Sequence, residues 1–223
     1  PGCYISPMIT HKNDPIGEFY LRGFEYSLNH LKILSEHVQF NNCGVVELGS
    51  GKVDKDLSES VVPPAYIEKL SQHEASELSS IKLNSGSLHI KRSGWASPVD
   101  LCRANISAFP DNIKTIFSQN ILSLEKIGSN WSAIDASGAN IASAPVVIIT
   151  NASDANNFTQ TNWVPLHKVR GQLTYLPARN LNIQKMLCYD GGYISPEING
   201  FNYIGATYNR TNMSTDVTIE DHK

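Results

Sequence analysis

The residues of this sequence that most suggest a binding site form the tripeptide Arg170-Gly171-Gln172, which opens a predicted strand over 172–176. A glycine lets a ligand approach the backbone closely, and an arginine can bind a carboxylate through two parallel hydrogen bonds. The same tripeptide is also compatible with a solvated loop end or with an arginine that holds the strand by a backbone carbonyl. Evidence from the neighbouring segments is needed to choose between these interpretations.

Aromatic and polar residues follow this tripeptide near several predicted turns. They are Tyr189, Tyr193, Tyr203, Tyr208 and Arg210. These side chains could line one face of a sheet, with Arg210 as a second candidate for binding an anion. The alternative is a set of ordinary cross-strand tyrosines, which composition alone favours because tyrosine is common in strands.

The sequence lacks the short motifs of several enzyme classes. No G-x-G-x-x-G, P-loop, G-x-S-x-G or H-E-x-x-H motif occurs. The seven histidines and four cysteines show no ligand spacing, so we expect no metal site.

Two helices are predicted from their caps and their apolar spacing. Asp14 before Pro15 is a favourable helix start, and Ser97, Pro98 and Asp100 form a second one. After the first start, apolar residues recur every three or four positions, which predicts a long amphipathic helix. They are Leu21, Phe24, Leu28, Leu31, Leu34 and Val38.

The remainder of the chain is rich in predicted strands. The run 146–150 is continuously apolar and β-branched after Ala-Pro, which predicts a strand buried on both faces. Asn199-Gly200 between two runs predicts a two-residue hairpin. Further strands are predicted over 45–48, 113–117, 120–125, 131–136, 186–189, 193–195 and 203–206. A chain that leaves one layer and later returns to it indicates two interleaved domains.

The composition limits the possible classes of protein. The chain has 223 residues, 41% of them hydrophobic and 17% charged, which suffices for one large core or two small ones. A net charge of −3 provides no general basic surface for nucleic acid. No apolar run is long enough to cross a membrane, so we expect a cytoplasmic protein. Because the sequence begins at Pro1 and ends without a closing element, we expect a fragment of something longer.

Four segments resemble one family when taken together and in order. They are PGCYISP, GWASPVDLCRA, APVVIITNASDANNFTQTNWVPLHKVRGQLTYLP and MLCYDGGYISPEINGFNYIGATYNR. The chain resembles the FAD-dependent oxidoreductase part of the bacterial tRNA 5-methylaminomethyl-2-thiouridine biosynthesis bifunctional proteins, which belong to the D-amino-acid oxidase-like flavoproteins. The resemblance runs from Gly2 to Arg210.

The resemblance implies a mixed α/β and α+β architecture, in which part of a Rossmann-like FAD domain is interleaved with a mostly antiparallel substrate domain. We expect 1–90 to hold the long helix and the first part of the substrate domain, and 91–160 to hold part of the FAD-binding domain. Residues 161–223 would then be the second part of the substrate domain.

The resemblance also implies the roles of individual residues. The predicted cofactor contacts are Gly2, Ile121, Thr150, Asn151, Ala152 and Gly171. The predicted catalytic residues are Arg170, Gln172, Tyr193 and Arg210. In the implied reaction, FAD takes a hydride from the CH₂ of a carboxymethylaminomethyl group on a wobble uridine of tRNA. The imine then hydrolyses, and an arginine holds the carboxylate.

Departures from the family pattern leave alternatives open. The family usually continues the buried strand into Asn-Gly, whereas Ala152 follows Asn151 here, and the glycine-rich phosphate-binding fingerprint is missing. We therefore expect this fragment to be inactive alone and not to retain FAD. The complete protein could carry a fused methyltransferase domain outside this fragment. One rival hypothesis is a glycine- or sarcosine-type oxidase, and Glu197 is evidence against it. The other is a non-catalytic binding module.

Overall fold

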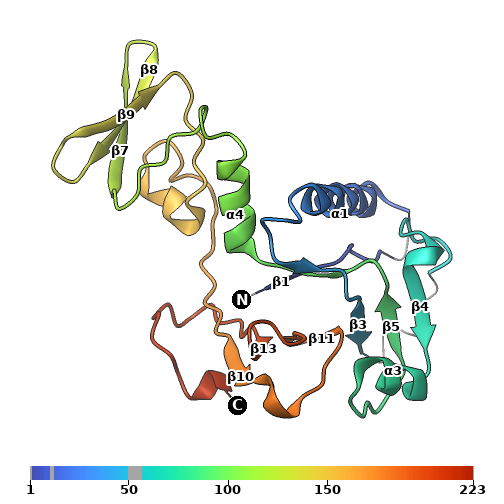
Figure 1. The fold of residues 1–223 in the computed structure, drawn as a ribbon. Coiled ribbons are helices and arrows are strands. Elements are labelled where there is room, and N and C mark those ends of the chain that lie inside the picture. The colour runs from blue at the N-terminus through green and yellow to red at the C-terminus, as the bar shows by residue number, and fades with distance from the viewer. Residues whose placement is uncertain (1, 11–12, 50–56, 223) are drawn as a thin grey trace. The chain divides into compact units, whose positions relative to one another are not determined.

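The structure is a computed structural model that describes residues 2–10, 13–49 and 57–222. The chain divides into two compact units (Figure 1). Unit 1 comprises Pro1–Pro110, Gly171–Tyr208 and Asp216–Lys223, and unit 2 comprises Asp111–Arg170 and Asn209–Thr215. The chain therefore passes between the units more than once, as the order of predicted elements indicated. Each unit is described by itself below.

Helix α1 (Pro15–Ile33) begins where the sequence predicts. The Asp14 carboxylate accepts a hydrogen bond of 2.6 Å from the backbone N–H of Gly17, and Pro15 occupies a position that needs no donor. Four of the predicted apolar side chains, Leu21, Phe24, Leu28 and Leu31, are buried along one face of the helix. The helix ends at Ile33 rather than near Val38, and a turn carries Leu34 and Val38 into the same core.

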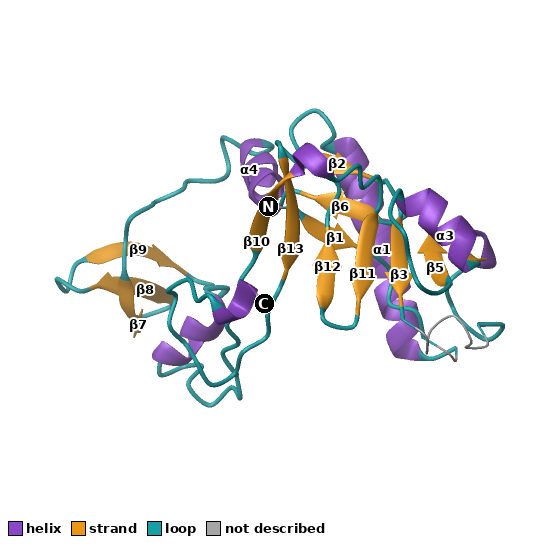
Figure 2. Ribbon diagram, turned by 90° about the horizontal axis from the view of Figure 1, so that it is seen from below, coloured by secondary structure: helices purple, strands orange, loops and turns teal. Residues whose placement is uncertain are grey.

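A seven-stranded sheet forms the centre of unit 1 in the order β10-β13-β12-β11-β3-β5-β4. Figure 2 shows β13, β12, β11 and β3 side by side. Its strands are β3 (Val45–Leu48), β4 (Ile67–Leu70), β5 (Ser87–Ile90), β10 (Thr174–Pro177), β11 (Met186–Tyr189), β12 (Gly192–Ile194) and β13 (Phe201–Gly205). The pair β11–β3 is parallel and joins the two halves of unit 1, while the other pairs are antiparallel.

The predicted hairpin at Asn199-Gly200 is confirmed. Ile198 pairs with Phe201, and the two residues between them have φ angles of 53° and 86°. Positive φ at both central positions is the geometry of the turn that matches the twist of antiparallel strands.

The two faces of the large sheet pack against different partners. Val46 and Leu187 face α3 (Gln72–Ser79), whose Ser71 and Glu74 form a complete capping box. Val45, Met186 and Cys188 lie on the opposite face, here called the inner face, and pack against Trp95. The register of β3 with β5 and β11 places alternate residues of each strand on this inner face.

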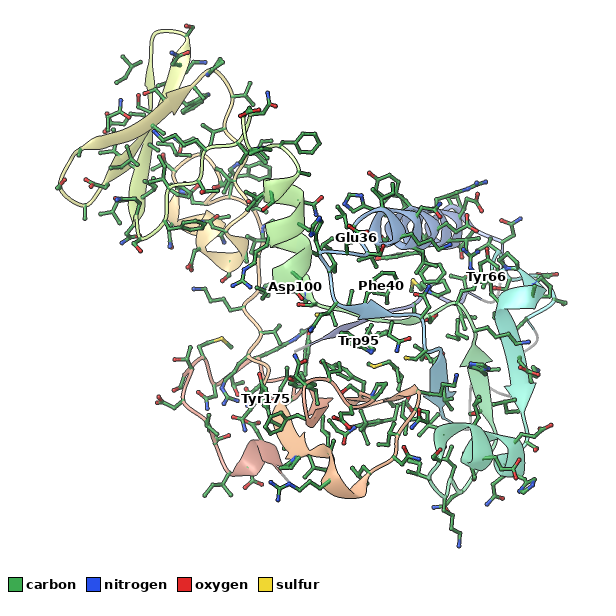
Figure 3. All side chains as sticks on the ribbon, in the orientation of Figure 1. Glu36, Phe40, Tyr66, Trp95, Asp100 and Tyr175 are labelled. Carbon is green, nitrogen blue, oxygen red and sulfur yellow. The ribbon has the colours of Figure 1, made fainter. Side chains whose placement is uncertain are left out.

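A small sheet lies between α1 and the inner face of the large sheet (Figures 1 and 3). It consists of β1 (Cys3–Ile5), β6 (Gly94–Ala96) and β2 (Phe40–Asn41), in the order β1-β6-β2. Helix α4 (Pro98–Ser107) follows β6, and the Ser97 side chain accepts a hydrogen bond from the backbone N–H of Asp100 as predicted. Short 3₁₀ helices occupy Pro64–Tyr66, Ala178–Asn180 and Glu220–His222.

Unit 2 contains a three-stranded antiparallel meander and a 3₁₀ helix. The strands are β7 (Ile121–Ile127), β8 (Asn130–Asp135) and β9 (Asn140–Ala144), and the 3₁₀ helix spans Ala152–Asn157. The predictions for β7 and β8 are confirmed within a few residues, while β9 was not predicted because its alternation is weak.

Two predicted strands of unit 2 are wrong in this structure. Residues 113–117 and 146–150 have no strand pairing, and Val146 and Ile148 are 72% and 81% exposed. A strand is buried on both faces only where neighbouring strands and covering helices exist. The described residues of unit 2 provide neither for 146–150, so this apolar run remains extended and exposed.

Candidate functional site

The ends of β1 and β12 bring two predicted site residues together in unit 1. The Tyr193 hydroxyl donates a hydrogen bond of 3.5 Å to the carbonyl oxygen of Gly2, and the rings of Tyr193 and Tyr4 lie 5.9 Å apart. A Cβ at Gly2 would lie 2.8 Å from the Trp95 ring and 3.0 Å from Ile198. Packing inside unit 1 therefore requires glycine at this position, whatever its predicted contact with a cofactor.

The chemistry of Tyr193 follows from its surroundings. Burial, followed by the neighbouring Cys3 and Cys188, raises its pKa to about 12. The phenol is therefore neutral at any physiological pH. Tyr193 can donate or accept a hydrogen bond at this site, but it cannot serve as a base.

The inner face continues from Tyr193 into a pocket of about 460 Å³. The register aligns Tyr193 with Cys188, Cys188 with Glu47 and Glu47 with Leu88, so these four residues form one row across β12, β11, β3 and β5. The last three of them line the pocket. Glu47 is the charged side chain among the described residues that line it. Tyrosine and serine hydroxyls and apolar side chains form the rest of the lining, and a carboxylate among them favours a cationic group such as an ammonium.

In unit 2, three predicted cofactor residues line one hollow. Ile121, Thr150 and Asn151 surround a cavity of about 550 Å³ together with apolar side chains and the amides of Gln119, Asn120 and Asn157. In the following 3₁₀ helix, Ala152 has a φ of +52°. This left-handed conformation favours glycine, which agrees with the Asn-Gly of the family pattern.

The predicted tripeptide is divided between the units. The Arg170 backbone pairs with Asn209, and its Nε donates a hydrogen bond of 2.7 Å to the carbonyl oxygen of Ser214, all within unit 2. This is the backbone-carbonyl contact that the sequence left open as an alternative. The exposed Arg210 lies in the same short segment of unit 2. The roles of both arginines in binding an anion remain predictions.

Gly171 and Gln172 belong to unit 1 and make contacts with its own backbone. A Cβ at Gly171 would lie 3.1 Å from the carbonyl oxygen of Thr207. The Gln172 amide both donates to and accepts from the backbone of Thr218, at 3.0 Å each. These contacts give Gln172 a structural role, and its catalytic role remains a prediction.

The predicted set of tyrosines does not share one face. Tyr203 is buried on the inner face near Tyr193, whereas Tyr189 lies one residue after Cys188 in β11 and therefore points to the other face. Tyr208 is 67% exposed beyond the end of β13. The sequence analysis missed Cys3, Tyr4 and Glu47, although the segment PGCYISP held a signal for the first two.

The comparisons with known proteins agree with this architecture. The model of the family described as "DAO: FAD dependent oxidoreductase" matches residues 5–223. Solved structures with the same fold include glycine oxidase from Geobacillus kaustophilus, with a TM-score of 0.77, 18% identity, and coverage of 95% of this chain and 60% of that one. Iminodiacetate oxidase from Chelativorans sp. BNC1 has a TM-score of 0.73 and 17% identity, and the match covers 98% of this chain and 64% of that one. The fold is therefore that of the D-amino-acid oxidase-like flavoproteins.

This chain belongs to the FAD-dependent oxidoreductase family. It is similar to the tRNA 5-methylaminomethyl-2-thiouridine biosynthesis bifunctional proteins MnmC of Stutzerimonas stutzeri, at 29% identity over 214 residues, and Aromatoleum aromaticum, at 31% over 212 residues. These matches cover 93% and 92% of this chain, but 32% and 33% of the relatives. The chain thus spans about a third of the length of these relatives.

The residues of the unit 2 hollow fit part of the family's cofactor. Asp154, which pairs with Lys168, is the acidic residue of the lining, and the rest of it consists of amides, a hydroxyl and apolar side chains. Amides and a hydroxyl beside apolar walls suit a heterocycle with polar substituents, such as the adenosine of FAD. Close to the hollow in sequence, Asn156 Oδ1 and Gln160 Oε1 are buried without a hydrogen-bond partner among the described residues. Ile121, Thr150 and Asn151 are therefore the residues that would hold this end of FAD. No cation is among the described lining residues, so the hollow does not suit the pyrophosphate.

The described residues provide neither a metal cluster nor a membrane-spanning helix. No group of three or more histidine, cysteine, aspartate or glutamate side chains is placed to hold a metal ion in the part of the chain that the structure describes. Within the same residues, no helix is long and apolar enough to cross a membrane.

Proposed function

We propose that this chain is part of a flavin-dependent amine oxidoreductase that removes the carboxymethyl group from carboxymethylaminomethyl-(2-thio)uridine at the wobble position of tRNA. The observation that carries the proposal is the match of more than nine-tenths of the chain to the tRNA-modifying relatives. A methyltransferase domain elsewhere in the complete protein, and a cytoplasmic site of action, belong to the same proposal.

The side chains of unit 1 suit the amine of this substrate. A secondary amine enters largely as a cation, and the Glu47 carboxylate on the pocket wall favours that charge. Tyr193 borders the same row with a neutral phenol, which can hold a polar atom of the substrate by a hydrogen bond.

The oxidation is balanced by one hydride acceptor, the release of one ammonium proton to solvent, and one water. The chemistry that FAD supplies when bound is acceptance of a hydride from a carbon next to an amine. The substrate CH₂ becomes an imine carbon, water adds to it, and the C–N bond then breaks. The aminomethyl group stays on the uridine and the two-carbon acid leaves as an aldehyde. This chain must orient the CH₂ and hold the carboxylate, for which Arg170 is the proposed clamp.

The experiment uses the complete protein with its flavin and follows the visible flavin absorption under anaerobic conditions. Bleaching after addition of tRNA that carries carboxymethylaminomethyluridine would support the proposal. Bleaching by glycine or sarcosine, but not by the tRNA, would contradict it and favour a small-molecule amine oxidase. A complete protein without any flavin would contradict both and favour the binding module.

A further inference from the structure

A groove in unit 1, separate from the Glu47 pocket, lies between β1 and one side of α1. Its volume is about 630 Å³, within the range of pockets that hold small ligands. Five aromatic side chains line it: Tyr4 on β1, Tyr193 on β12, and Phe19, Tyr20 and Phe24 on α1. The groove is therefore lined by Tyr193, which the sequence predicted as a catalytic residue and which contacts Gly2 in the structure.

Three of these rings are well exposed, whereas Phe24 is buried and Tyr193 is half-buried. Phe19 is 73% exposed, and Tyr4 and Tyr20 are each 49% exposed. Phe19 and Tyr20 stand edge to face, with centroids 5.8 Å apart and an interplanar angle of 76°. Next to them, a Cβ at Gly23 would meet nothing within 4 Å, so the wall of α1 is open at this turn. Ring faces are thus available to a flat ligand without any rearrangement of the helix.

The charge of the groove limits what can occupy it. No described residue of its lining carries a charge, and its polar groups are hydroxyls, a thiol and backbone. A free amino acid carries two charges, and both would lose hydration here without a partner. A pyrimidine base is planar and uncharged at neutral pH, and it stacks on aromatic rings. Charge and shape therefore favour a base over a free amino acid.

We propose that this groove is a stacking site for the uracil ring that carries the amine substituent, a proposal that rests on the proposed function. A base held against Phe19 and Tyr20 shares one groove with Tyr193, and the adjoining Glu47 pocket shares Tyr4 and Tyr20 with it. The base is thus recognised on the helix side, while its amine substituent reaches the inner face of the sheet. This arrangement distinguishes a nucleoside substrate from a small amine.

The test compares a double variant with a matched control on the same helix. Phe19→Ala with Tyr20→Ala removes two rings of the groove. Tyr26→Ala removes a ring that is 71% exposed but lies outside the groove, where it stacks on His30. Each variant is made in the complete flavin-loaded protein, and the rate of flavin reduction is measured with modified tRNA and with sarcosine.

The double variant is expected to reduce the second-order rate constant for the tRNA by about 5- to 150-fold, the range for loss of stacking on one base. Its flavin content is expected to match that of the wild type. Because Tyr20 also lines the Glu47 pocket, the rate with sarcosine is expected to fall, but far less than the rate with the tRNA. Tyr26→Ala is expected to change none of the three. Restoring rings with Phe19→Tyr and Tyr20→Phe is expected to return most of the rate with tRNA.

Three outcomes would overturn the stacking site. They are equal losses with tRNA and sarcosine, loss of flavin from the double variant, and a double variant that behaves like Tyr26→Ala. If the wild type is not reduced by the tRNA at all, the proposed function fails separately. The groove is then judged from the Kd of free carboxymethylaminomethyluridine: binding at least about tenfold weaker to the double variant supports the site, and equal binding overturns it.

Discussion

Unit 1 and unit 2 differ in how fully their side chains are supported. In unit 1 the large sheet packs apolar residues on both of its faces, the small sheet and α1 bury further apolar clusters, and the Tyr193 hydroxyl bonds to the carbonyl of Gly2. In unit 2 the meander stands beside an apolar segment in which Ile148 is 81% exposed. Side chains held in place by packing can orient a substrate. An accessible apolar hollow suits a ligand that fills it and covers its exposed side chains.

We propose that the two units have different tasks. Substitutions in unit 1 should change how the substrate is bound and oriented, while substitutions around the hollow of unit 2 should change how much flavin is bound. Arg170 is an exception to this proposed division of tasks, because it belongs to unit 2 but is proposed to hold the substrate carboxylate.

The largest effect is expected for Arg170→Ala in the complete protein. Loss of a charge-assisted pair should lower turnover with the tRNA substrate by about 10- to 150-fold, and flavin content should fall far less. Stopped-flow reduction and the flavin-to-protein absorbance ratio measure the two quantities. Arg170→Lys is the matched control, because it keeps the charge and loses the planar geometry. Loss of flavin with unchanged turnover per bound flavin would show that the Ser214 contact is the purpose of Arg170.

A smaller effect is expected for Tyr193→Phe in unit 1. Removing one neutral hydrogen bond should slow flavin reduction by about 3- to 10-fold. Because the pKa of Tyr193 is about 12, the shape of the pH–rate profile below about pH 10 should not change. The same profile measured for the wild type is the reference. A profile that loses one of its titrations in the variant would contradict the view that Tyr193 stays neutral.

A stabilising change is expected for Ala152→Gly in unit 2. The φ of +52° at Ala152 costs an alanine roughly 1 kcal/mol, and glycine adopts it without strain. The variant should raise the free energy of unfolding by up to about this amount, as measured by urea denaturation. Ala155→Gly in the same 3₁₀ helix is the control, where a gain is not expected. A loss of stability in Ala152→Gly would show that the alanine side chain contributes packing that exceeds the strain.

The smallest effect concerns the pH dependence of stability in unit 1. Burial, and then the charge of Lys185, lowers the pKa of His89 below its ordinary 6.5. The unfolded chain therefore binds this proton more readily than the folded protein, so stability should fall as the pH drops below about 6.5. His89→Gln should flatten that part of the curve of urea midpoint against pH. The curve of the wild type is the reference, and an identical curve for His89→Gln would contradict the argument.

The sequence by itself determined the elements whose causes are local. The start of α1 follows from Asp14 and Pro15, the start of α4 from Ser97 and Pro98, and the hairpin from Asn199-Gly200. A cap or a turn depends on a few adjacent residues, so its signal is complete in the sequence. The same holds for the family, because the quoted segments retain their order.

Only the tertiary structure decided which residues that are distant in sequence become neighbours. In the tertiary structure, Gln172 is hydrogen-bonded to Thr218. Tyr203, but not Tyr189, lies on the same sheet face as Tyr193. Glu47 joins the row of residues that ends at Tyr193. The tertiary structure also leaves 146–150 unpaired, although the sequence predicts a buried strand there. Burial and strand pairing depend on which distant segments are present to cover a residue, and no local pattern contains that information.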